Sequence, residues 1–199
     1  MAISVTGELY ESITGQLFEL GRQLRQPNGY PFDPVALKRY LQAGIEGRFT
    51  PEADIIVRVD RSTKPVYPDW VKEVLYPELE LTGPVEYPIA KVELWLHDEQ
   101  KDEDSVINGQ KNYEYLKTNN MLESCLGLSD LITIRSFGLD VFRRYFNIKT
   151  VFAWKSVVRH TDGVLYVPCL EEDSGEVLFH WFWLEHDFNS SEPALRFAK

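Results

Sequence analysis

Three apolar runs decide the fold: VFAWKSVVR at residues 151–159, VLYVPCL at residues 164–170 and VLFHWFWL at residues 177–184. They are joined by Thr161-Asp162-Gly163 and by Asp173-Ser174-Gly175, and short glycine-containing loops between apolar runs are typical of β-hairpins. The pattern therefore predicts a three-stranded antiparallel β-meander within residues 148–188.

The length of the two loops decides which side chains of this meander meet. Two-residue turns at Asp162-Gly163 and Ser174-Gly175 would place Ser156, Cys169 and His180 side by side across the three strands. A thiol beside an imidazole is the minimal pair of nucleophile and base, so this row, with His160 nearby, is a candidate catalytic site. The alternative is a small buried cysteine next to a hydrogen-bonded histidine. A three-residue second loop would instead turn His180 to the other face, because a one-residue slip flips every side chain.

With the same pairing, the opposite face of the meander carries aromatic rings and two cations. Such rings stack on a peptide, a sugar or a base, and cations fix an anionic group, so a binding surface is one interpretation. The other is that helices cover this face, since a sheet that is apolar on both sides normally has both faces covered. The candidate ligand- or partner-binding residues are Lys155, Arg159, Tyr166, Phe179, Trp181 and Trp183.

The N-terminal region has a helical pattern followed by a strand pattern. Apolar residues recur every three or four positions in Tyr10–Leu24, which predicts a helix that Pro27-Asn28-Gly29 ends. Asp33-Pro34 is typical of the start of a second helix, and we expect the two helices to pack as a hairpin. After residue 47 the period changes to two, so Asp54–Arg61 is predicted to be a strand.

The middle of the chain begins with a proline-rich connector, because six of the eleven prolines lie between Pro51 and Pro88. We expect mostly extended chain there, with a short helical piece at Asp69–Leu75. Residues Ile89–His97 alternate as in a strand but also show helical spacing, and we favour a helix. Further helices are predicted at Gln110–Thr118, Ser129–Arg135 and Ser136–Phe146.

Together these segments predict one α+β domain over residues 1–199, with the meander packed on helices. The apolar fraction of 44% in 199 residues is ample for one core. Within the domain we expect a helical hairpin (1–50), a strand and proline-rich connector (51–88), a mainly helical middle (89–147), the β-meander (148–188) and a tail (189–199).

Several short segments, YEYLK at 113–117, SCLGL at 124–128, WKSVVR at 154–159 and LYVPC at 165–169, occur in this order along the chain. In these segments, and in YPFDP at 30–34 and PALRF at 193–197, the sequence resembles a family of uncharacterised bacterial proteins with no assigned activity. The resemblance implies a bacterial cytoplasmic protein, and it assigns a role to no residue.

Charge and cysteine content restrict the partners. A formal charge of −10, from 31 acidic and 21 basic residues, argues against general binding to nucleic acids or anionic membranes. The sequence has no apolar window of the roughly 18 residues that a membrane span needs, and its start lacks the pattern of a signal peptide. Its two cysteines, Cys125 and Cys169, lie far apart and outside any zinc-binding pattern. We therefore expect a cytoplasmic protein with free thiols.

No metal or other cofactor is predicted. In a strand His180 and His186 would share a face but stand about 20 Å apart, which no single ion bridges. The common nucleotide-phosphate, hydrolase and zinc-protease motifs are also missing from the sequence. The sequence therefore favours a non-enzymatic binding module that uses the aromatic face, with another protein or a second copy of the chain as partner. The alternative is a thiol-dependent hydrolase or transferase that uses Cys169 and His180.

Overall fold

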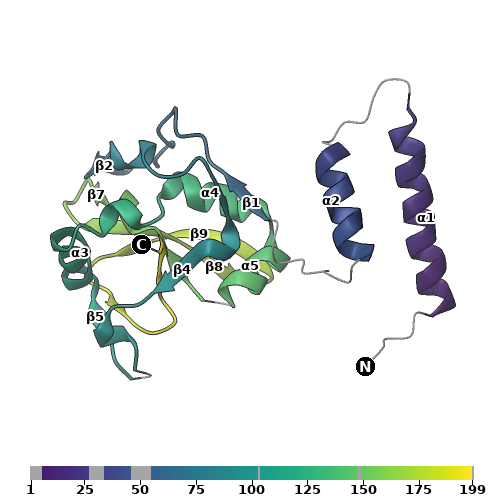
Figure 1. Ribbon diagram of the computed structural model, residues 1–199. Coiled ribbons are helices and arrows are strands. Elements are labelled where there is room, and N and C mark those ends of the chain that lie inside the picture. The colour runs from purple at the N-terminus through teal and green to yellow at the C-terminus, as the bar shows by residue number, and fades with distance from the viewer. Residues whose placement is uncertain (1–5, 27–33, 46–54, 103, 148, 199) are drawn as a thin grey trace. The chain divides into compact units, whose positions relative to one another are not determined.

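The computed structural model describes residues 6–26, 34–45, 55–102, 104–147 and 149–198 (Figure 1). The chain forms two compact units, Met1–Pro51 and Glu52–Lys199, whereas the sequence pattern predicts a single domain. Each unit is described by itself. The protein is a mixed structure of helices and strands, in agreement with the α+β prediction.

The first unit contains helices at both predicted places, α1 (Gly7–Leu24) and α2 (Pro34–Ile45). Helix α1 begins where the hydroxyl of Thr6 accepts a hydrogen bond from the Leu9 amide at 3.4 Å. Proline suits the first position of α2 because its missing amide hydrogen would have no partner there. No side chain of α1 is buried, so the packing of the two helices as a hairpin stays a prediction. The predicted cap Asp33 lies outside the described residues.

The second unit is built on a seven-stranded sheet. Six strands follow in the order β2 (Val71–Val74), β7 (Val158–His160), β8 (Leu165–Asp173), β6 (Val151–Phe152), β11 (Ala194–Phe197) and β4 (Val92–Trp95), and β9 (Glu176–Trp183) pairs with β8. All neighbours are antiparallel except β6 and β11. Two small antiparallel pairs complete the strands: β1 (Ile56–Arg58) with β3 (Glu86–Pro88), and β5 (Ile107–Asn108) with β10 (Asp187–Phe188).

The second predicted turn of the meander has the expected length. Ser174 and Gly175 have φ values of +51° and +82°, as a two-residue type I′ turn requires, and Asp173 faces Glu176. Cys169 therefore faces His180 across the hairpin of β8 and β9. A serine at positive φ is strained, so the turn is held by the pairing of its two strands.

The first predicted turn is one residue longer than expected. His160 donates its amide hydrogen to the Val164 carbonyl at 2.8 Å, which leaves residues 161–163 as a three-residue loop. The side chain of Asp162 accepts a hydrogen bond from the Val164 amide, and Gly163 has a φ of +95°, a conformation that glycine supplies at low cost. The predicted two-residue turn at Asp162-Gly163 is therefore wrong.

The run at residues 151–159 is also not one strand. A 3₁₀ turn, η5 (Trp154–Ser156), separates β6 from β7, and both strands pair with the same side of β8. Pro168 in β8 fits this arrangement, because its carbonyl accepts a hydrogen bond from the Ala153 amide at 3.0 Å. The C-terminal region thus supplies several strands of a larger sheet and not an isolated three-stranded meander.

Three further predictions need correction. The segment at residues 89–97 forms a single 3₁₀ turn, η2 (Ile89–Lys91), followed by β4, so the helix favoured there is wrong. The helical piece predicted at residues 69–75 is β2. The predicted tail contains β11, which lies inside the sheet between β6 and β4. In each case the sequence pattern of a short segment was ambiguous, and pairing with a strand far away in the sequence determines its secondary structure.

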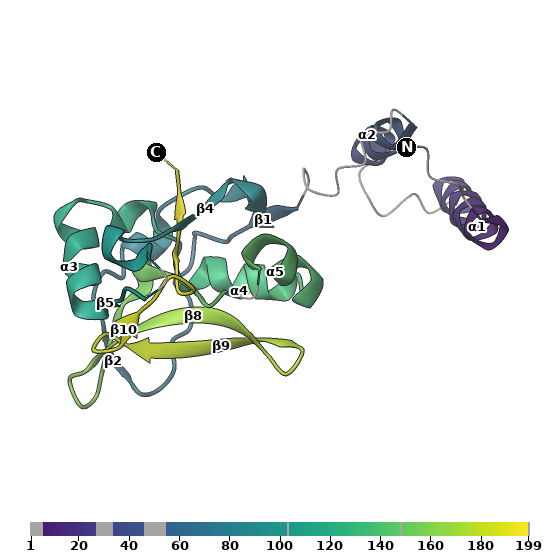
Figure 2. The same ribbon diagram turned by 90° about the horizontal axis from the view of Figure 1, so that it is seen from below.

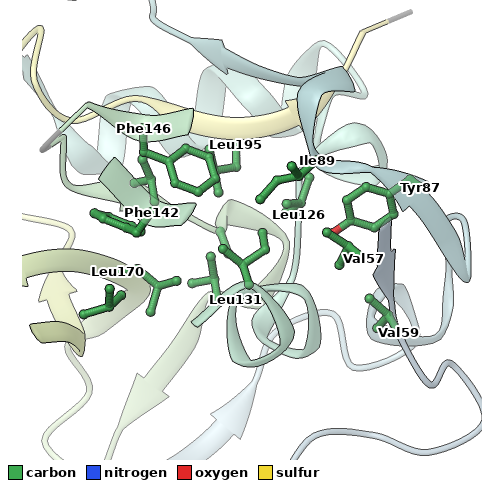
Figure 3. Packing of buried hydrophobic residues seen from close by; sticks show 14 residues of the cluster. Val57, Val59, Tyr87, Ile89, Leu126, Leu131, Phe142, Phe146, Leu170 and Leu195 are labelled. Carbon is green, nitrogen blue, oxygen red and sulfur yellow. The ribbon is translucent and has the colours of Figure 1, made fainter. Parts of the chain in front are cut away.

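Three helices of the middle region lie close to their predicted places: α3 (Gly109–Thr118), α4 (Leu128–Ser136) and α5 (Leu139–Phe146). Figure 2 shows α4 and α5 on one side of the hairpin of β8 and β9. In Figure 3, Phe142 and Phe146 of α5 and Leu131 of α4 point into the same space as Leu170 of β8 and Leu195 of β11. This cluster is the core between helices and sheet.

A second core cluster lies around Phe152 and Trp154, which are 0% and 1% exposed. It contains Val167 and Cys169 from β8, and Leu184, which directly follows β9. Because both clusters include residues of β8, this strand is buried between them.

Candidate functional site

The proline-rich connector, helix α4 and strand β9 enclose an open groove of about 580 Å³, a volume common among ligand sites. Its rim is apolar and accessible, since Val66 is 90% exposed and Ile132 is 50% exposed. The lining residues are Val66, Tyr67, Pro68, Leu128, Ile132, Arg135, Ser136, Phe179 and Trp181.

The aromatic residues of the groove pack against one another. The ring centroid of Trp181 lies 5.3 Å from that of Trp70, with the two rings edge to face, and 5.7 Å from that of Phe179. Trp70 also contacts the ring of Tyr166 at 5.5 Å, and Tyr67 lies 6.3 Å from Trp181. Edge-to-face contacts of this kind fix ring orientation. The proline-rich connector therefore covers part of the aromatic face and builds one wall of the groove.

Among the residues that the structure describes, Arg135 is the one charged residue that lines the groove. Its Nε donates a hydrogen bond to the carbonyl of Val177 at 3.0 Å, which holds the guanidinium beside the start of β9. The neighbouring Ser136 hydroxyl donates to the carbonyl of Thr133 at 2.6 Å. The groove thus combines apolar walls with one positive charge at the end near Val177.

Buried hydrogen bonds hold two of the groove residues from behind. The Tyr67 hydroxyl donates to Glu80 Oε1 at 2.8 Å, and Glu80 is 0% exposed. The Ser156 hydroxyl donates to the same carboxylate oxygen and accepts a hydrogen bond from the Leu128 amide at 2.6 Å. Burial of Tyr67 and the negative charge of Glu80 raise the tyrosine pKa. The connector and the start of α4 are therefore fixed to one buried carboxylate.

A buried ion pair lies next to this carboxylate. Arg61 donates to both oxygens of Asp130, at 2.6 and 3.1 Å, and the two side chains are 5% and 0% exposed. Asp130 also accepts hydrogen bonds from the Tyr87 hydroxyl at 2.8 Å and the Gly127 amide at 2.9 Å. A Cβ on Gly127 would lie 2.6 Å from Glu80 Oε2, so the cluster leaves no room for a side chain there.

Lys155 belongs to this buried cluster, so its predicted place at the edge of the aromatic face is wrong. It is 1% exposed, and its Nζ lies 3.4 Å from the Thr82 carbonyl. Burial lowers the Lys155 pKa, an effect that the charges of Asp130 and Glu80 oppose. Lys155 leaves the predicted face because η5 interrupts the alternation of side chains along residues 151–159.

The other predicted binding residues are divided. Phe179 and Trp181 line the groove, and Tyr166 contacts the groove aromatics through Trp70. Arg159 donates to Glu73 at 2.9 Å and lines a separate hollow of about 290 Å³. Trp183 is 49% exposed and lies 6.1 Å from the ring of His186. The structure therefore brings part of the predicted face together and places Arg159 and Trp183 outside the groove.

The candidate catalytic row is not assembled as expected. Cys169 faces His180 on one side, but its other neighbour is Phe152, and Ser156 lies in the buried cluster with Glu80. The thiol is 0% exposed, and burial followed by the charge of Glu171 raises its pKa. The imidazole Nε2 of His180 lies 3.2 Å from Glu171 Oε1. An activated nucleophile needs a lowered thiol pKa, so this environment has the opposite effect.

Both thiols are expected to resist alkylation in the folded protein. Cys125 is 0% exposed, and burial raises its pKa to about 12, so only about one part in ten thousand is thiolate at pH 8. Iodoacetamide at pH 8 should modify neither Cys125 nor Cys169 until guanidinium unfolds the chain. Mass spectrometry of the treated protein measures the modification. A Val66→Cys variant supplies the exposed control that reacts at once. Rapid modification of Cys169 in the folded protein would contradict this expectation.

Among the described residues, no group of three or more histidine, cysteine, aspartate or glutamate side chains is placed to hold a metal ion. Within the same ranges, no helix combines the length and apolarity that crossing a membrane requires. No protein-family model matches the chain, and neither does any curated protein or any solved structure. The similarity to uncharacterised bacterial proteins therefore stays a prediction.

Proposed function

We propose that this protein is a non-enzymatic cytoplasmic interaction module whose groove binds an apolar segment of a partner protein. The observation that carries the proposal is an open groove with exposed apolar walls from three separate segments. Grooves of this size with a few placed polar groups are typical of binding sites. Two buried free thiols agree with a reducing compartment.

The groove walls are fixed before any ligand arrives. Tyr67 and Leu128 are tied to the buried Glu80 and Ser156, and the ring of Trp181 is held by Trp70 and Phe179. A fixed wall loses little conformational entropy on binding, and each side chain left mobile would cost roughly 0.5–1.5 kcal/mol. This rigidity favours recognition of one shape.

The charged groups behind the groove favour binding over catalysis. Glu80 and Asp130 are 0% exposed and already bonded to tyrosine, serine or arginine side chains. A general acid or base must reach the proton it transfers within hydrogen-bond distance. These carboxylates serve as anchors of the fold, and the groove itself presents apolar surface.

Selection of peptides from a displayed library on the purified protein tests the proposal. Selected peptides should bind the Ile132→Asp variant at least about tenfold more weakly than wild type, because the new carboxylate lies in the apolar wall. A tenfold loss of affinity corresponds to about 1.4 kcal/mol. Val85→Asp is the matched control, since Val85 is 60% exposed and does not line the groove. Equal binding to wild type and Ile132→Asp, or a library that yields no binder, contradicts the proposal.

A further inference from the structure

Strand β9 has a free edge beside the groove. It pairs with β8 alone among the described strands. In an antiparallel pair every second residue directs its amide and carbonyl to the partner, and the others direct them outward. The two-residue turn makes Asp173 and Glu176 a hydrogen-bonded pair, which sets this alternation. The outward residues are Val177, Phe179, Trp181 and Trp183.

The contacts at the end of the strand agree with this assignment. Leu184, one residue after Trp183, donates its amide hydrogen inward to the Leu165 carbonyl at 2.8 Å. The outward carbonyl of Val177 accepts its hydrogen bond from the side chain of Arg135. In the part of the chain that the structure describes, no hydrogen bond reaches the outward amides and carbonyls of Phe179 and Trp181. Phe179 and Trp181 therefore present unpaired main-chain groups at this edge.

The same two residues line the groove with their side chains. An extended peptide that paired with this edge would direct every second side chain to the face where Phe179 and Trp181 lie. Strand addition draws its affinity from main-chain hydrogen bonds and its specificity from pockets for alternate side chains. Edge and groove together supply both requirements.

The charge at one end of the groove sets the direction of such a peptide. Arg135 bonds to Val177 through Nε, and its two terminal guanidinium nitrogens make no hydrogen bond within the described ranges. An added strand antiparallel to β9 has its C-terminus near the start of β9, where this guanidinium lies. A guanidinium is suited to bind a carboxylate through two parallel hydrogen bonds.

We propose that the groove binds the C-terminal segment of a partner protein, as a strand antiparallel to β9 with its terminal carboxylate on Arg135. This inference rests on the proposed function and specifies the ligand class and the mode of binding. A second copy of β9 would offer no terminal carboxylate at this place, because an internal strand has no free terminus. Two copies would also each carry a net charge of −10, which opposes their association.

The test compares acetylated hexapeptides that have apolar residues at alternate positions and either a free C-terminal carboxyl or a C-terminal amide. Binding is measured by fluorescence polarisation. The free acids should bind wild type about tenfold or more tightly than the amides, the size of a charge-assisted bidentate contact. N-methylation of the amides that face β9 should abolish binding, whereas N-methylation of the alternate amides should have little effect.

Substitutions at Arg135 show whether the preference depends on this side chain. Arg135→Gln should remove the preference for the free acid, and Arg135→Lys should keep part of it. Arg58→Gln is the control, because Arg58 is an exposed arginine bonded to Glu86. If acids and amides bind equally and N-methylation has no effect, strand addition is wrong while a peptide groove stands. If no peptide binds, the proposed function fails with it. Concentration-dependent dimers that Trp181→Ala dissociates would overturn the assignment in favour of a second copy.

Discussion

Asp130→Asn is expected to lower the free energy of unfolding of the unit 52–199 by about 3–5 kcal/mol, because it leaves Arg61 as a buried charge without its counterion. The carboxylate accepts four hydrogen bonds, from Arg61 twice, from Tyr87 and from the Gly127 amide. An asparagine offers one acceptor oxygen, and its amide group turns a second position into a donor. Denaturation in urea, followed by tryptophan fluorescence, measures the loss.

An exposed ion pair supplies the control for this substitution. Arg58 and Glu86 are joined at 3.0 Å with side chains 72% and 54% exposed, so Glu86→Gln should cost at most about 1 kcal/mol. The double variant Arg61→Met with Asp130→Leu should recover part of the loss, since it removes the unpaired charge. A loss for Asp130→Asn no larger than that for Glu86→Gln would show that the buried pair does not hold the fold.

Phe152→Ala is expected to cost about 3–5 kcal/mol as well, through the cavity that it leaves in the second core cluster. Phe152 is 0% exposed, and its ring lies 5.0 Å from Phe188 and 5.4 Å from Phe182, both edge to face. It also belongs to β6, the short strand that joins β8 to β11. Loss of the ring therefore weakens the core where the two parts of the sheet meet.

The same denaturation measurement applies, with Val66→Ala as the control. Val66 is 90% exposed, so its truncation should change the free energy of unfolding by less than about 0.5 kcal/mol. Phe152→Leu keeps most of the apolar volume and should lose less than Phe152→Ala. Equal stabilities of Phe152→Ala and wild type would mean that the surrounding residues fill the space of the missing ring. That result would contradict the expected cavity.

The turn residues Ser174 and Gly175 predicted the register of the strands that they join, because that register depends on residues close together in the sequence. The pairing of Cys169 with His180 follows from Ser174-Gly175, because a two-residue turn with positive φ fixes the register of its own strands. The break in the run at residues 151–159 had no such signal. The amide of Lys155 bonds to the carbonyl of Leu126, 29 positions earlier in the chain, so a distant segment decides η5. Short strands were missed for the same reason, as when Leu94 pairs with Leu195.

The site was predicted to the extent that the hairpin contains it. Phe179 and Trp181 could be predicted as binding residues because successive side chains of a strand point to opposite faces. Tyr67, Ile132 and Arg135 come from the connector and α4, and no spacing within the sequence brings them to β9. The buried ion pair was missed too, since Arg61 and Asp130 are 69 positions apart. The sequence offers one indication of this groove wall, which is the aromatic residue Tyr67 within the proline-rich connector.

The place of β11 has a consequence for synthesis of the chain on the ribosome. This strand follows every other strand in the sequence, yet it lies between β6 and β4 and pairs with both. At about 5–20 residues per second, β4 must wait roughly 5–20 s after its own synthesis for residues 194–197. During that interval β4, and β6 once it has been synthesised, expose unpaired edges, the type of surface that chaperones shield in a nascent chain.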